Sequence, residues 1–139
     1  MVALTAFHAL RSGDLRTIRL ADIRSGRLYL STRVIPLAEP VRVRIQAWLS
    51  ERERRWPHSA NPYLFISRRT AVCVEPVGVA WVTQRLGLTA QAIREDRILD
   101  ELHATGGDIR RICDLFGLGI AGAARYGSAL EHPDLAYYK

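Results

Sequence analysis

Lysine is almost absent from this chain of 139 residues. Lys139, the last residue, is the only one, and the other nineteen basic side chains are arginines. A guanidinium keeps its proton up to a pKa of about 12 or more, so it acts as a fixed charge and is a poor proton donor. The only side-chain amine that could take part in a catalytic step is therefore that of the final residue, Lys139.

Cysteine is also scarce, and long apolar runs are missing. Cys73 and Cys113 lie far apart without the spacing of metal ligands, so we expect two small buried side chains and neither a disulfide nor a zinc site. No apolar run approaches the ~20 residues of a membrane span, and no basic-then-apolar leader opens the chain. We therefore expect a soluble cytoplasmic protein that has no metal, no cofactor and no membrane partner.

The chain carries a marked positive charge. Twenty basic residues against fourteen acidic ones give a net charge of +6 and a pI near 10.0. An arginine bias can also follow from coding composition, but the net charge stands in either case. A charge of this size is typical of proteins that meet a polyanion such as nucleic acid.

The apolar pattern predicts a single, mostly helical α+β domain over residues 1–139, in which the polar segment 127–139, broken by Pro133, is a flexible tail. A small three-stranded antiparallel sheet is expected on one edge. Its strands are predicted at 27–30 and 33–37, joined as a hairpin through Ser31-Thr32, and at 63–67. Helices are predicted at 2–10, from Pro40 onward, at 76–86 and within 88–126.

The stretch 88–126 has the clearest helix signals. Thr89 is a competent N-cap for a first helix, which Thr105-Gly106-Gly107 ends. Asp108 begins a second helix, and Gly117 and Gly119 break the chain before a short third one. The core stripe of the second helix is Ile109, Ile112, Cys113 and Phe116, at i, i+3, i+4 and i+7.

Several segments occur in an order that resembles the catalytic domain of the tyrosine recombinase (phage integrase) family. The chain has counterparts of that family's Gly-Leu-Arg-x-x-Glu-Leu motif, His-x-x-Arg helix, Leu-Gly-His turn and nucleophilic tyrosine. These are Ala9-Leu10-Arg11-Ser12-Gly13-Asp14-Leu15, Gln91-Ala92-Ile93-Arg94, Phe116-Gly117-Leu118 and Tyr126. Both arginines and the tyrosine match, whereas both histidine positions differ.

The resemblance implies metal-free cleavage and rejoining of double-stranded DNA. Arg11, oriented by Asp14, and Arg94 would grip a phosphodiester while Tyr126 attacks phosphorus, and Gln91 would donate a hydrogen bond in place of a histidine. Arg68 and Arg69 resemble a family segment that passes near DNA phosphates, and Arg27 or Arg33 would occupy the space of the family's catalytic lysine. The DNA contacts expected in this way are Arg33, Arg68 and Arg69.

The same resemblance implies a nucleoid-associated protein that pairs with itself or with another recombinase protomer. The family's separate N-terminal DNA-clamping domain has no counterpart within 1–139, so the chain is expected to be a solitary catalytic domain or a fragment of a longer protein. Glu95 is interpreted as a member of a structural ion pair.

Two alternatives stay open because the acid–base residues are missing. One is a catalytically inactive DNA-binding protein with the recombinase fold, since Gln91 cannot exchange a proton and Leu118 has no polar side-chain atom. The other is a helix-turn-helix transcription regulator formed by residues 108–128. Its reading helix would be poor in side chains that reach base edges, because 120–124 holds only Ile, Ala and Gly.

Overall fold

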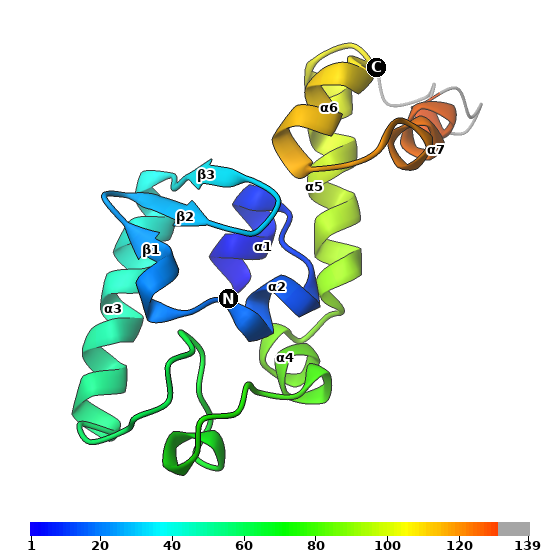
Figure 1. Ribbon diagram of the computed structural model, residues 1–139. Helices are drawn as coiled ribbons and strands as arrows, with labels where there is room; N and C mark the ends of the chain where they lie inside the picture. The colour runs from blue at the N-terminus through cyan, green and yellow to red at the C-terminus, as the bar shows by residue number, and fades with distance from the viewer. Residues whose placement is uncertain (131–139) are drawn as a thin grey trace.

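The computed structural model describes residues 1–130, which form helices and one small sheet (Figure 1). Their order is α1 (Val2–His8), α2 (Ser12–Thr17), the 3-10 turn η1 (Leu20–Asp22), β1 (Ile23–Arg24), β2 (Arg27–Tyr29), β3 (Val34–Pro36), α3 (Glu39–Arg55), the 3-10 turn η2 (Thr70–Val72), α4 (Val79–Leu86), α5 (Ala90–Ala104), α6 (Ile109–Phe116) and α7 (Ile120–Leu130). Residues 131–139, which include most of the tail expected to be flexible, lie outside the described range.

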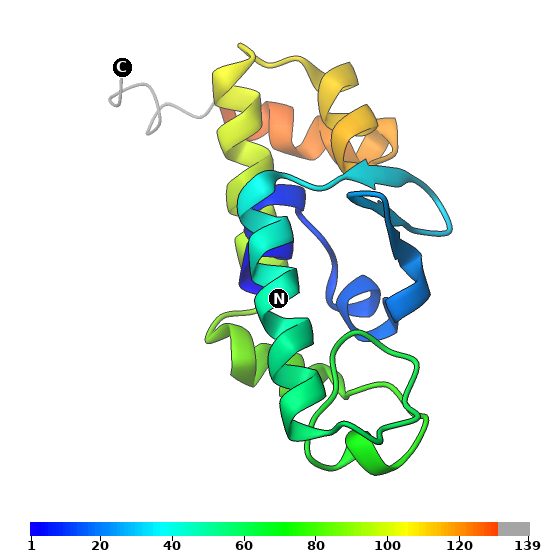
Figure 2. The same cartoon turned by 90° about the vertical axis from the view of Figure 1, so that its left-hand side faces the viewer.

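Two clusters of buried side chains form the interior. The larger gathers α1, α2, the sheet, α3 and α4 around residues such as Leu15, Leu28 and Val41. The smaller joins the C-terminal half of α5 to α6 and α7 around Ile98, Leu102, Ile112, Phe116 and Ala123. Both views show α6 and α7 together at the C-terminal end of α5 (Figures 1 and 2). Helix α5 thus connects the two halves of the molecule.

The predicted hairpin is confirmed. Strands β2 and β3 pair antiparallel with Leu28 opposite Ile35, and the Leu30 amide donates to the carbonyl of Arg33 across the turn. Both paired side chains are buried, so each strand directs its middle residue into the core. A second tight turn has Ser25 and Gly26 at φ of 50° and 72°, and it returns the chain from β1 to β2.

The third predicted strand, at 63–67, is wrong. Only Tyr63 forms an isolated bridge, with Arg19, and the third strand of the sheet is β1, for which no strand was predicted. Side chains of α3 satisfy the backbone of the 61–64 segment: Arg52 donates to the carbonyl of Asn61, and the Trp48 indole donates to that of Leu64. Because a short apolar run fits a strand or a buried loop equally well, its pattern could not separate the two.

Two helix caps match their predictions, and one helix start differs. The Thr89 hydroxyl accepts from the Ala92 amide and the Asp108 carboxylate from the Arg111 amide, as N-caps do. Helix α4 begins at Val79, three residues after the predicted start at Pro76, and Val79 is exposed. Helix α1 ends at His8, two residues before the predicted end, because Ala9 adopts a left-handed conformation.

The two cysteines are free thiols, as expected, but they are only half-buried. None of the helices within residues 1–130 has the length and apolar composition that crossing a membrane requires.

Candidate functional site

A buried arginine lies in the second turn of α5. Arg94 is only 4% exposed, and its Nε donates to the carbonyl of Ala9 at 3.0 Å. One terminal guanidinium nitrogen, Nη2, is buried without a hydrogen-bond partner among the described residues. A buried cation with an unused donor is costly, so the position favours an anionic ligand.

Arg11, Tyr126 and Asp14 act on this guanidinium. Burial lowers the pKa of Arg94, and the positive charge of Arg11 lowers it further. Tyr126 and Asp14 oppose this and raise the pKa. Arg11, just before α2, and Tyr126, on α7, therefore lie within electrostatic reach of Arg94 on α5.

Asp14 positions Arg11 through the backbone. Its carboxylate accepts from the Arg11 amide at 3.1 Å, which stabilises the first turn of α2. No ion pair joins the Asp14 carboxylate to the Arg11 guanidinium within residues 1–130, and Arg11 is exposed. The guanidinium is consequently available to a ligand.

Tyr126 is half-buried and packs on the smaller core cluster. Its helix lies close to α6 because Gly127 has no side chain: a Cβ there would be 3.1 Å from Cδ1 of Ile109. Ala123, one turn earlier, is fully buried. Close packing of small residues therefore fixes the side of α7 that carries the tyrosine.

Arg33 is a third guanidinium of this cluster, and its partners were not predictable from sequence. It is half-buried and donates to the carbonyls of Leu115 and His8, near the C-terminal ends of α6 and α1. Burial lowers its pKa, Asp14 raises it, and Arg94 and Arg11 lower it. A cation at helix C-termini is favourable, so Arg33 connects the hairpin to two helices instead of extending into solvent.

The residue expected to replace a histidine points elsewhere. Gln91 is exposed and its amide donates to the carboxylate of Glu95 at 2.6 Å, while Arg94 of the same helix is buried. Glu95 forms no ion pair within residues 1–130, so its interpretation as an ion-pair member is wrong; its partner is an amide. Leu118 packs on the smaller core cluster.

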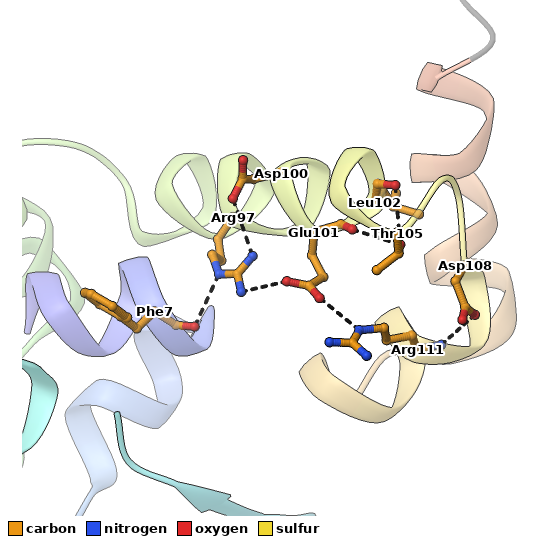
Figure 3. A network of polar contacts seen from close by, with 8 residues as sticks. All are labelled: Phe7, Arg97, Asp100, Glu101, Leu102, Thr105, Asp108 and Arg111. Carbon is orange, nitrogen blue, oxygen red and sulfur yellow. Dashed lines mark hydrogen bonds and ion pairs between the residues drawn. The ribbon is translucent and has the colours of Figure 1, made fainter. Parts of the chain in front are cut away.

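A polar network that the sequence did not reveal joins α5 to α6 (Figure 3). Arg97 and Arg111 each donate to the carboxylate of Glu101, at 2.8 and 2.9 Å, and Arg97 also contacts Asp100 and the Phe7 carbonyl. The Arg97 and Glu101 spacing of i, i+4 was the only signal in the sequence. The network holds α6, which leads through Gly117 to the tyrosine helix.

Replacing Glu101 with glutamine should lower the free energy of unfolding at neutral pH by about 1–2 kcal/mol. Hydrogen bonds from Arg97 and then Arg111 hold the pKa of Glu101 below its ordinary value of 4.5. Its contribution is therefore present above pH 4.5 and is lost as the pH falls through the depressed value. Urea unfolding at several pH values measures this. Asp96→Asn, on an exposed position of the same helix, is the control and should change little.

Acidification should weaken the fold through His8. Its Nε2 accepts from the Ala38 amide at 3.3 Å, and burial, then Arg33 and Arg97, lower its pKa from 6.5. The unfolded chain takes up this proton first, so stability falls as the pH drops below about 6.5. Urea midpoints measured from pH 7 to pH 5 should decrease less in His8→Gln, which keeps an acceptor without this titration. An equal decrease would assign the pH dependence to other groups.

The two other arginines predicted to contact DNA, Arg68 and Arg69, belong to a different segment of the chain from Arg11, Arg33 and Arg94. Arg68 and Arg69 are exposed in the turn before η2, where Ser67 and Thr70 hydrogen-bond to each other. Within the described part of the chain, no group of three histidine, cysteine or acidic side chains could hold a metal ion.

Comparison with known proteins supports the fold. No family model matches the chain, and no curated protein matches its sequence. The chain is similar to the crystal structure of XerA recombinase, with a TM-score of 0.71 at 20% sequence identity. The similarity covers 99% of this chain and 56% of the XerA chain. The chain therefore has a tyrosine recombinase-like fold, mostly helical with a small three-stranded antiparallel sheet, and spans little more than half of that protein.

Proposed function

We propose that the chain is a DNA-binding recombinase-like domain that cleaves and rejoins DNA strands slowly through a phosphotyrosyl intermediate. The observation that carries the proposal is the buried Arg94 guanidinium, which has an unused donor and lies near Arg11 and Tyr126. Two guanidinium groups can stabilise the charge of a phosphodiester under attack, and a hydroxyl can supply the nucleophile. The similarity to XerA recombinase gives the fold-level support.

In the proposed reaction, the Tyr126 oxygen attacks phosphorus and its proton passes to solvent water. The bond from phosphorus to the 5′ oxygen breaks, and that oxygen takes up a proton to leave as a hydroxyl. Rejoining reverses both steps. Each step exchanges one phosphodiester for another, so the reaction needs no external source of energy. Arg11 and Arg94 stabilise the extra negative charge on the non-bridging oxygens as the transition state forms.

Three departures from the family predict a low rate. Gln91 bonds to Glu95, Leu118 is apolar, and no lysine occurs within residues 1–130. Losing a general acid costs ~10²–10⁴ in rate, and losing one oxyanion donor costs ~10²–10³. Protonation of the leaving oxygen would then depend on water or on another protomer.

DNA binding without cleavage is the second candidate, favoured by Gln91, which is exposed and hydrogen-bonded to Glu95. In this case Arg11, Arg68 and Arg69 are exposed guanidinium groups that would contact phosphates, while Arg33 would support the site from its position between two helix ends. A transcription regulator using α6 and α7 has less support, because the first turns of α7 expose few polar side chains.

The test is to incubate the chain with supercoiled plasmid and stop the reaction with detergent. The proposal predicts slow relaxation and a covalent adduct whose nucleotide-bearing peptide contains Tyr126 by mass spectrometry. Binding should weaken steeply with salt, since each phosphate contact releases counterions. Salt-sensitive binding without adduct would select the second candidate, and the absence of binding would contradict both.

A further inference from the structure

All three tryptophans of the chain line one pocket, on other elements than the arginine cluster. Its volume is about 220 Å³, and Arg11, Arg94 and Tyr126 take no part in it. We call it the tryptophan pocket; its defining residues are Trp48, Trp56 and Trp81 with Arg55, Arg68 and Arg85. It lies where the C-terminal end of α3 meets α4.

The Trp48 ring is held in place by a hydrogen bond and by two neighbouring aromatic rings. The indole nitrogen of Trp48 donates to the Leu64 carbonyl at 2.8 Å. Its ring meets that of Trp56 edge-on, with centroids 6.4 Å apart, and that of Phe65 at 6.1 Å. A ligand would therefore not have to order these rings, which lowers the entropic cost of binding.

The opening of the pocket is positively charged. Arg55 lies over the Trp56 ring at 5.8 Å and Arg85 over the Trp81 ring at 5.5 Å. Arg55 is paired with Glu51, but neither Arg68 nor Arg85 contacts a carboxylate within the described part of the chain. An aromatic pocket with this rim repels cations and favours an apolar group flanked by negative charge.

We propose that the tryptophan pocket binds an acidic peptide segment of a partner protein. One apolar side chain fills the cavity, and flanking carboxylates pair with Arg85 and Arg68. The volume is below the roughly 300–1,000 Å³ of pockets that enclose a whole small molecule, so it suits a single anchoring side chain. Tryptophan and arginine are also the residues that most often dominate binding energy at protein interfaces.

An unpaired nucleobase fits the pocket less well. Bases bind aromatic side chains by stacking on the ring face. One face of Trp56 and one face of Trp81 carry the guanidinium groups of Arg55 and Arg85, which a base stacking on that face would have to displace. A carboxylate can pair with the same guanidinium groups from the solvent side and leave them in place.

Intrinsic fluorescence tests the proposal directly because every tryptophan lies in the pocket. The full chain is titrated with an array of short acidic peptides that lack tryptophan, each with a different apolar side chain between aspartate and glutamate. We expect a saturable change in emission for at least one peptide. Replacing its apolar residue with serine, or its acidic residues with lysine, should abolish the change.

Arg85→Glu should raise the dissociation constant about tenfold, because an attractive charge at the rim becomes repulsive. The matched control is Arg110→Glu, which makes the same charge change at an exposed position outside the pocket and should have little effect. Circular dichroism confirms that both variants are folded. An array that leaves the emission unchanged, or a single-stranded oligonucleotide that alone saturates it, would overturn the proposal.

Discussion

Tyr126→Phe is expected to reduce covalent attachment to DNA to background while leaving DNA affinity nearly unchanged. The substitution removes only the oxygen that would bond to phosphorus. The ring still packs on the smaller core cluster, so the fold and the exposed guanidinium groups remain. Removing the nucleophile of a serine protease costs ~10⁶ in rate, so we expect a loss of similar size here.

The measurement is the detergent-stopped plasmid assay, run beside an electrophoretic shift with the same DNA. Tyr29→Phe is the matched control, because Tyr29 lies in β2 with Arg24 over its ring and should not react. Adduct that persists in Tyr126→Phe would assign the attack to another residue. Equal loss in both variants would indicate an indirect effect on the fold.

Arg94→Met is expected to make the fold more stable and the phosphate site inactive. The wild-type side chain keeps a charged group buried with one unused donor, near the positive charges of Arg11 and Arg33. Methionine has a similar volume and needs no donor or acceptor, so it removes this cost while losing one hydrogen bond to Ala9. We expect the free energy of unfolding to rise by about 1 kcal/mol, as when apolar residues replace buried charges.

The same variant should lose the response to anions. Inorganic phosphate should raise the thermal midpoint of the wild type and not that of Arg94→Met, because only the wild type has the Arg94 guanidinium beside Arg11 to bind it. Adduct formation should fall by at least about a hundredfold, as for loss of an oxyanion donor. Arg94→Lys, which keeps the charge without the planar fork, should be intermediate. A destabilised Arg94→Met that still responds to phosphate would make Arg94 a structural residue.

Local features of the fold could be predicted because each has a local cause. Thr89 and Asp108 cap their helices with their own side chains, and the hairpin pairing of β2 with β3 follows from alternation and a short turn. The motif order placed Arg11, Arg94 and Tyr126 as candidates for one site, and the fold brings them within electrostatic reach. Their catalytic roles remain a proposal.

Features that depend on distant partners could not be predicted. The 63–67 segment carries strand-like residues, yet only Tyr63 bridges a neighbouring segment, at Arg19, and Arg52 and Trp48 of α3 bind the carbonyls of Tyr63 and Leu64. In the sequence, Arg33 is an ordinary hairpin arginine. Its partners, the carbonyls of Leu115 and His8, lie near the C-terminal ends of α6 and α1, which are distant in the sequence. The gathering of three tryptophans was equally invisible, because α3 and α4 are adjacent only in space.

The sequence by itself therefore determined the helix caps, the hairpin, the net positive charge and the scarcity of lysine, since these depend on neighbouring residues or on composition. Tertiary structure alone decided that Arg94 is buried while Gln91, on the same helix, is exposed. The spacing of these two residues predicts a shared face, but burial depends on which part of that face α1 covers. A fixed helical period cannot specify this, because contacts between distant elements determine it.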